Sequence, residues 1–138
     1  MAHWLAKSEP HVYAWDTFVA EGRTFWNGVR NSEARNNMRA MKLGDRVAWY
    51  HSNDGKEVVG MAEVVCEAYP DPTAEGDPRW VCVDLAPVGP FPKAVTLAQF
   101  KADPILCETK LVKQGRLSVT PLSPEQFARL CELGGYGG

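Results

Sequence analysis

A strand–turn–strand pattern lies in the middle of this chain. Residues 46–52 and 58–69 are rich in β-branched and aromatic residues, and the sequence Asn-Asp-Gly stands between them at 53–55. This turn sequence favours the positive φ angles of a tight hairpin, so the two segments are predicted to pair as antiparallel strands. Residues 79–88 have a similar composition and follow the proline-rich connection 70–78, and we expect them to form a third strand.

Shorter elements precede this hairpin. Residues 3–7 are predicted to form a strand. An apolar stripe at helical spacing follows it and ends at Gly22, which indicates a short helix. Residues 24–32 are rich in Asn, Gly and aromatic residues, and we interpret them as an ordered loop. The stripe of the first helix consists of Trp15, Phe18 and Val19.

Three more helices are predicted. One covers residues 32–41, where apolar residues again repeat at helical spacing. The other two begin at capping boxes, Thr96 with Gln99 and Ser123 with Gln126. The helix at 32–41 has Ala34, Met38 and Met41 on its inner stripe, and the last helix buries Phe127, Leu130, Cys131 and Leu133 before Gly134 and Gly135 end it.

Length and composition indicate one domain over residues 1–138. The chain has 138 residues, of which 45% are apolar and 23% charged, as in globular proteins with a single hydrophobic core. Several strands with short helices between them predict an α+β fold built on a strongly curved antiparallel sheet or a small barrel. Periodicity does not distinguish the open sheet from the closed one.

The charge is distributed unevenly. The net charge of −2 excludes a protein that holds nucleic acid by bulk positive charge. Residues 23–46, however, contain six basic and two acidic residues, a local charge of +4. Arg35, Arg39 and Lys42 repeat along one edge of the predicted helix at 32–41. This edge is either a face for an anionic ligand, with these three residues as phosphate contacts, or a solvated helix surface.

Cysteine and histidine spacing gives no sign of a metal site. The chain has four cysteines, at 66, 82, 107 and 131, and three histidines, and neither set forms a zinc motif. We expect the cysteines to be buried, reduced thiols. No apolar run is long enough to span a bilayer, and the first ten residues do not resemble a secretory signal. We therefore expect a cytoplasmic protein.

Two segments carry candidate binding residues. Trp26 and Asn27 lie in a polar loop just before Arg30, so an indole, a carboxamide and a guanidinium occur close together, as in sites that stack and hydrogen-bond a nucleobase. The alternative is that Trp26 fills the core from a loop. In the strand at 46–52, alternation places Trp49 and His51 on one face and Tyr50 and Ser52 on the other, so adjacent His51 and Ser52 are not a catalytic pair.

Several motifs occur together in a characteristic order. They are Trp4-Leu5-Ala6-Lys7-Ser8-Glu9-Pro10, Trp26-Asn27-Gly28-Val29-Arg30-Asn31, Ala34-Arg35-Asn36, Tyr50-His51-Ser52 and Leu117-Ser118-Val119. With this set, the chain resembles the EVE domain family over essentially its full length. His3 and Ala6 stand where the family more often has Tyr and Met, and Trp49 stands where Phe is usual.

The resemblance implies a fold and a site. The fold would be PUA-like, a small mixed β-barrel or strongly curved sheet flanked by helices. The family is associated with reading modified bases in DNA or RNA. The ligand-binding residues it implies here are Lys7, Ser8, Trp26, Asn27, Arg30, Tyr50, His51 and Ser52, with Trp80 as a further wall.

The expected function is therefore recognition without chemistry. We expect a monomeric module that binds a nucleic acid carrying a modified base, methylated or hydroxymethylated, without a cofactor, metal or membrane. Two alternatives stay open. One is a small hydrolase of modified nucleosides, as in ASCH-type relatives of the fold, in which Lys7 and Glu9 would supply the catalytic groups. The other is a partner-binding module that has an exposed apolar patch in place of a pocket.

Overall fold

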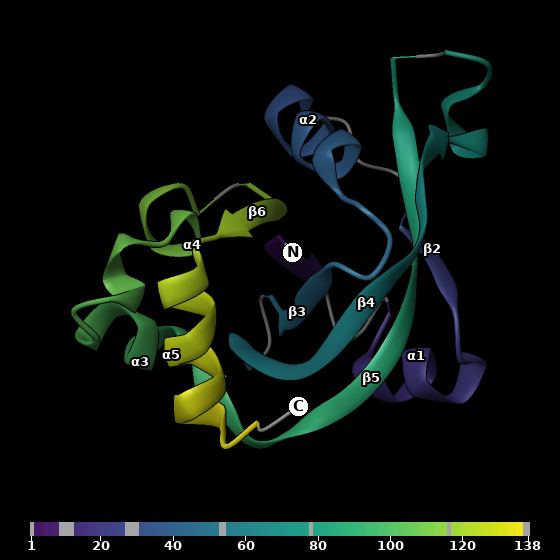
Figure 1. The fold of residues 1–138 in the computed structure, drawn as a ribbon. Helices are drawn as coiled ribbons and strands as arrows, with labels where there is room; N and C mark the ends of the chain where they lie inside the picture. The colour runs from purple at the N-terminus through teal and green to yellow at the C-terminus, as the bar shows by residue number, and fades with distance from the viewer. Residues whose placement is uncertain are drawn as a thin grey trace.

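The structure is a computed structural model. It describes residues 2–8, 13–26, 31–52, 55–77, 79–115 and 117–136. The strands in this part of the chain are β1 (His3–Ser8), β2 (Thr24–Trp26), β3 (Arg46–His51), β4 (Glu57–Pro70), β5 (Val81–Thr96) and β6 (Val119–Leu122). They form one mixed sheet in the order β2-β5-β4-β3-β1-β6 (Figure 1).

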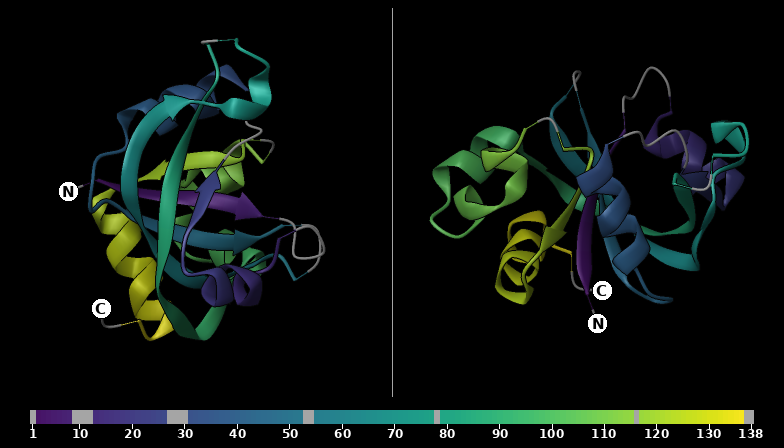
Figure 2. Two further views of the ribbon diagram at one scale, coloured as in Figure 1. Left: turned by 90° about the vertical axis from the view of Figure 1, so that its right-hand side faces the viewer. Right: turned by 90° about the horizontal axis from the view of Figure 1, so that it is seen from above.

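Helices cover both faces of this sheet. They are α1 (Trp15–Glu21), α2 (Ser32–Ala40), α3 (Leu97–Ala102), α4 (Lys110–Lys113) and α5 (Pro124–Gly134), with 3-10 turns at Pro72–Ala74 and Leu106–Glu108. Helices α3, α4 and α5 lie together on one side of the strands and α1 lies on the other (Figure 2). The sheet therefore separates two hydrophobic cores.

The two cores follow from strand alternation. The first core, beneath α1 and α2, includes Phe18, Met38 and Trp49. The second core, beneath α3 and α5, includes Tyr50 and Leu130. Because successive side chains of a strand point to opposite faces, adjacent residues of β3 enter different cores, as the sequence predicts.

Curvature of the sheet comes from its two longest strands. β4 and β5 pair along most of their lengths, and the register between them shifts at several points, as at β-bulges. β1 pairs in parallel with β3 and antiparallel with β6. The terminal strands of the order, β2 and β6, are not paired with each other in the described part of the chain. The expected α+β class is confirmed. The sheet is curved and unclosed, and the parallel pairing of β1 with β3 makes it mixed, where the strand pattern predicted an antiparallel one.

Most predicted elements are present. β3 and β4 form the expected antiparallel pair, Gly22 ends α1 in the left-handed conformation, and both capping boxes are formed. Two expectations about the elements near α1 were wrong. Part of the expected loop at 24–32 is the strand β2, and Val19 is 48% exposed, so it does not belong to the inner stripe of α1. β6 and α4 were not predicted.

All four cysteines are free, and Cys82 is the buried one among them, while the other three are partly exposed. The expectation of buried thiols is therefore correct only for Cys82. Among the described residues, no helix combines the length and apolar character needed to cross a membrane. The same residues contain no group of three or more His, Cys, Asp or Glu side chains suited to hold a metal ion.

Candidate functional site

Five aromatic rings meet on the first-core face of the sheet. The ring of Trp49 in β3 is fully buried at their centre. Phe18 of α1 stacks on it at a centroid distance of 4.3 Å, and Trp26 of β2 meets it edge-on at 5.0 Å and 86°. We call this set the aromatic cluster. Its members are Tyr13, Trp15, Phe18, Trp26 and Trp49.

Two backbone features position the cluster. Gly60, which pairs with Trp49 across β3 and β4, lets α1 approach the sheet, because a Cβ at Gly60 would lie 2.5 Å from the ring of Trp15. On the other side, β2 pairs with β5 so that Trp26 lies opposite Val83. Trp26 is only partly buried, so it stands at the edge of the cluster, whereas Trp49 fills its centre.

A charged network fixes β2 beside β5. The Nη2 and Nε atoms of Arg23 donate to Oδ2 of Asp84 at 2.7 and 3.2 Å. The hydroxyl of Tyr69 donates to the other carboxylate oxygen at 2.5 Å. Because Arg23 directly precedes β2 and Asp84 pairs with Phe25, this network holds the strand that carries Trp26.

The ends of β1 and β3 lie beside the aromatic cluster. Ser8 pairs with His51, and the N–H of Ser52 donates to the carbonyl of Ser8 at 2.9 Å. The Ser8 hydroxyl donates to the carbonyl of Tyr13, and Nε2 of His51 accepts the backbone N–H of Trp15 at 3.1 Å. Both strand ends are thereby joined to the segment that starts α1.

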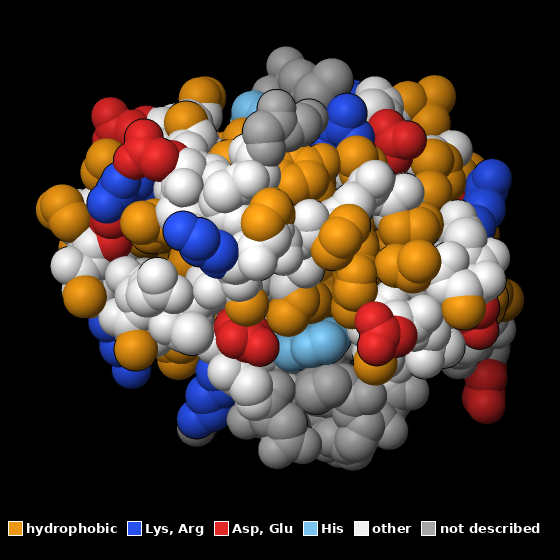
Figure 3. All heavy atoms as spheres, turned by 90° about the horizontal axis from the view of Figure 1, so that it is seen from below, with side chains coloured by type: hydrophobic (Ala, Val, Ile, Leu, Met, Phe, Trp, Pro, Cys, Tyr) orange, Lys and Arg blue, Asp and Glu red, His pale blue; other side chains and the backbone are white. Residues whose placement is uncertain are grey.

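Burial favours the neutral form of His51. Burial lowers the pKa of its imidazole, while the nearby carboxylates of Glu57 and Asp16 act in the opposite direction. Since Nε2 accepts a hydrogen bond from Trp15, the neutral ring carries its proton on Nδ1. Figure 3 shows a face on which hydrophobic side chains gather across the middle and a histidine lies between acidic side chains.

Lys7 and Tyr50 occupy the opposite face of the same strands. They are paired across β1 and β3, and Tyr50 is buried in the second core, where burial raises the pKa of its hydroxyl to about 12. Lys7 donates from Nζ to the carbonyl of Gly115 at 2.6 Å, and burial lowers the pKa of its ammonium group. The sheet therefore separates these two residues from the aromatic cluster.

A cavity of about 340 Å³ lies beside Gly115, the residue whose carbonyl accepts the hydrogen bond from Lys7. It is formed between the start of α2 and the connection from α4 to β6. Asn31 caps α2 by accepting the N–H of Ala34, and Glu33 forms an ion pair with Lys110 at 2.9 Å. The residues that line this cavity are Asn31, Glu33, Lys113, Gln114, Gly115 and Leu117.

The basic residues of α2 lie next to Trp80. The guanidinium groups of Arg35 and Arg79 lie 5.4 and 5.8 Å from the centroid of its ring. Arg39, one turn further along α2, donates from Nη2 to the carbonyl of Arg79 at 3.2 Å. Lys42 follows the helix, and its backbone N–H donates to Asp45. Trp80, the last residue of the β4–β5 connection, thus lies against α2.

The candidate residues therefore separate into groups. Ser8, Trp26 and His51 lie on the face of the aromatic cluster, Lys7 and Tyr50 lie on the other face, and Trp80 lies with the arginines. Asn27 and Arg30, and Glu9 of the hydrolase alternative, are outside the described residues. Sequence reasoning missed Tyr13, Phe18 and Trp49 as one cluster, although the apolar spacing before Gly22 could have drawn attention to it. It also missed the cavity wall at 113–115.

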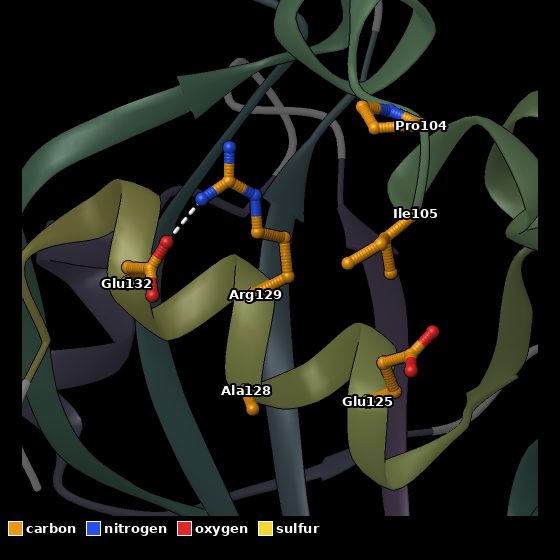
Figure 4. A pocket seen from close by; sticks show the side chains of 6 residues that line it. All are labelled: Pro104, Ile105, Glu125, Ala128, Arg129 and Glu132. Carbon is orange, nitrogen blue, oxygen red and sulfur yellow. Dashed lines mark hydrogen bonds and ion pairs between the residues drawn. The ribbon is translucent and has the colours of Figure 1, made fainter.

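A second cavity of about 340 Å³ lies away from this site, against α5 (Figure 4). Arg129 points across it toward Glu132 and also pairs with the buried carboxylate of Asp103 at 2.7 Å. The remaining lining residues are Pro104, Ile105, Glu125 and Ala128. Arg129 is thus held by two carboxylates, and its pair with Asp103 ties α5 to the segment that follows α3.

Comparisons with known proteins agree with this architecture. A sequence profile described as the EVE domain matches residues 2–133. The chain is 34% identical over 158 residues to thymocyte nuclear protein 1 of Gallus gallus, and the match covers 91% of this chain and 65% of the chicken protein. The chain thus spans slightly less than two thirds of that relative.

Solved structures resemble the whole chain. A protein from Agrobacterium tumefaciens has a TM-score of 0.97 at 46% identity, with 100% of this chain and 97% of that chain covered. The human THYN1 protein, in complex with DNA containing 5-methylcytosine, has a TM-score of 0.91 at 33% identity, with 97% and 98% covered. These similarities agree with the PUA-like α+β fold that the sequence motifs imply.

Proposed function

This chain belongs to the EVE domain family, and on that premise we propose that it binds a modified nucleobase in a nucleic acid without catalysing a reaction on it. The position of Trp26 carries the proposal. Its ring is fixed edge-on against a buried indole and remains partly exposed, so it can offer an aromatic surface to a base without unfolding the core. Stacking of a base on an aromatic ring is worth about 1–3 kcal/mol.

The proposed ligand is 5-methylcytosine in DNA. The human relative is described in complex with DNA that contains this base, and the two chains align over nearly their whole lengths. Burying the added methyl group against aromatic rings would contribute about 0.8 kcal/mol beyond the stacking. A base in a duplex must first be flipped out, at a cost of a few kcal/mol that phosphate contacts help to offset.

The residues proposed to contact the ligand surround Trp26 and the strand ends. Ser8 and His51 supply polar groups beside the aromatic cluster, and Ser52, whose backbone N–H bonds to Ser8, is proposed as a contact with them. The phosphates would be held by Arg35, Arg39 and Lys42 on and after α2. Asn27 and Arg30 follow Trp26 in sequence and are proposed contacts on the family resemblance. Lys7 is proposed to act from the neighbouring polar cavity, through its contact with Gly115.

One observation favours the hydrolase alternative. Burial lowers the pKa of Lys7, which raises the fraction of neutral amine available as a base. In this structure, however, its Nζ is engaged with the carbonyl of Gly115, on the face opposite the aromatic cluster. Incubation with a panel of modified nucleosides, followed by mass detection of products, distinguishes the functions, because a binding module releases each nucleoside unchanged.

Fluorescence titration tests the binding function. Duplexes that differ only in carrying cytosine, 5-methylcytosine or 5-hydroxymethylcytosine at one position are added to the protein, and quenching of tryptophan emission is followed. A modified duplex should quench at lower concentration than the unmodified one, and the difference should be lost in Trp26→Ala. Equal titration curves for all three duplexes would contradict the proposal.

A further inference from the structure

Three arginines from two separate elements converge around Trp80. Arg35 and Arg39 belong to α2, and Arg79 lies at the end of the connection between β4 and β5. The guanidinium groups of Arg35 and Arg79 lie over the indole ring of Trp80. Arg39 bonds to the backbone of Arg79. We call Arg35, Arg39, Arg79 and Trp80 the arginine–tryptophan cluster.

Positive charge exceeds negative charge in this cluster. Arg79 pairs with Asp77 at 2.8 Å and remains 70% exposed. Arg35 donates to the neutral side chain of Asn36, and Arg39 to a carbonyl oxygen. Within the described residues, neither of these two arginines forms an ion pair. Several of their N–H donors therefore remain available to an anion.

A structural role alone does not explain two cations on one ring. One guanidinium is enough for a cation–π contact, and here a second one also lies within about 6 Å of the same ring centroid. Such a convergence is favourable where an anion lies between the charges. Guanidinium forks match phosphate oxygens in geometry, and arginine is the usual residue at such sites.

The position of the cluster relates it to the candidate site. α2 begins at Ser32, shortly after Trp26 in sequence. Arg35 lies in the first turns of the helix, and Arg39 lies about 6 Å further along its axis. The basic side chains therefore follow α2 and meet the end of the β4–β5 connection at Arg79 and Trp80. Figure 1 shows α2 and this connection at the same end of the molecule.

We propose that α2 and the end of the β4–β5 connection, at Arg79 and Trp80, form a two-sided clamp for the sugar–phosphate backbone of duplex DNA beside the bound base. Arg79 supplies the second side of this clamp, facing Arg35 and Arg39, and Trp80 is a positioning residue that aligns the guanidinium groups. This inference rests on the proposed function, because it places the backbone next to the site at Trp26. It adds the β4–β5 connection to the binding surface.

Salt dependence of binding tests the clamp. The dissociation constant for an unmethylated duplex is measured between about 50 and 200 mM salt for wild type, Arg35→Gln and Arg79→Gln. Each lost phosphate contact should lower the slope of log K against log salt by about 0.9. Lys101→Gln is the matched control, because it removes an exposed positive charge from α3 on the other side of the sheet. An unchanged slope in both arginine variants would overturn the clamp.

Two further variants separate charge from structure. Arg79→Lys keeps the charge and should keep the wild-type slope. Asp77→Asn removes the carboxylate that pairs with Arg79 but keeps an oxygen acceptor for its backbone N–H. We expect this variant to bind DNA more tightly, since a competing anion is removed. Weaker binding by Asp77→Asn with an unchanged thermal midpoint would contradict the clamp.

Failure of the clamp is distinguishable from failure of base recognition. The arginine variants should weaken binding of methylated and unmethylated duplexes equally and leave the ratio of the two affinities unchanged. Trp26→Ala should change that ratio and leave the salt slope unchanged. If the wild-type protein binds both duplexes equally and the arginine variants have lower salt slopes, base recognition is contradicted and the clamp is supported. If the wild-type protein binds the methylated duplex more tightly and the arginine variants keep the wild-type salt slope, the clamp is contradicted and base recognition is supported.

Discussion

The indole of Trp26 stands almost perpendicular to that of Trp49, at 86° with a centroid distance of 5.0 Å. Trp49 is fully buried, whereas Trp26 lies at the edge of the aromatic cluster and is partly exposed. One ring therefore belongs to the core, and the other is in contact with both the core and the surface. This difference separates the effects of the two residues on stability and on binding.

Substitution of the two tryptophans should separate these effects. Trp26→Ala should weaken binding of a methylated duplex by about 1–3 kcal/mol, the value of one base–aromatic stack. Trp49→Ala should lower the free energy of unfolding by about 3–5 kcal/mol, because it leaves a cavity at the centre of the cluster. Urea denaturation and binding titration measure the two quantities. A Trp26→Ala variant as unstable as Trp49→Ala would contradict this assignment.

Gly60 should not tolerate a side chain. A Cβ there would lie 2.5 Å from the ring of Trp15, so α1 would have to move away from the sheet. We expect Gly60→Ala to lower the free energy of unfolding by about 1–3 kcal/mol, as for an overpacked core. Gly89→Ala in β5 is the matched control, because its Cβ would meet Tyr136 at an ordinary 3.8 Å. Equal stability of the two variants in urea would be the contrary result.

The stability of the fold should fall as the pH is lowered from about 7.5 to 5.5. Burial lowers the pKa of His51, so the unfolded chain binds a proton at a higher pH than the folded one does. The stabilisation is thus complete above the unfolded pKa and is lost as the pH falls toward the folded value. Protonation would also place a hydrogen on Nε2, which accepts the N–H of Trp15.

His51→Gln isolates this contribution, since glutamine does not titrate and offers an oxygen acceptor. Urea denaturation at both pH values should show a smaller pH-dependent loss of stability in His51→Gln than in wild type. His3→Gln is a necessary comparison, because burial, followed by the N-terminal charge, lowers the pKa of His3 as well. A loss in His51→Gln as large as in wild type would show that His51 is not coupled to α1.

Tyr50 should not contribute to ligand binding. Its side chain is buried in the second core, on the face of β3 opposite Trp49. Tyr50→Phe should therefore bind methylated and unmethylated duplexes with wild-type affinities. Calorimetric titration of this variant and of the wild-type protein measures this, and a several-fold loss of affinity in a variant that stays folded would mean that the site reaches the second core.

Local signals predicted much of the fold. The antiparallel pair β3–β4, the two capping boxes and the end of α1 at Gly22 each have a signal in a few adjacent residues, so they could be predicted from the sequence; Asn53 and Asp54 themselves lie outside the described residues. β2 was missed because its three residues have no alternation to detect and are held by pairing with the distant β5. The four-residue strand β6 depends in the same way on β1.

The candidate site could be predicted only in part. Family motifs named Ser8, Trp26 and His51, which share the face of the aromatic cluster. They also named Tyr50, although alternation along the strand already separates it from Trp49. The contact of Trp80 with Arg35 joins residues far apart in the chain, and no local pattern indicates it.

The ratio of two dissociation constants tests base recognition most directly. Wild-type protein is titrated, at about 150 mM salt, with duplexes that are identical except for one methyl group on a cytosine. Burial of this methyl group at about 0.8 kcal/mol corresponds to roughly fourfold tighter binding of the methylated duplex. We expect the dissociation constant of the unmethylated duplex to be about four or more times that of the methylated one, and this ratio to fall to about one in Trp26→Ala. A ratio of one in the wild-type protein would contradict recognition of the modified base.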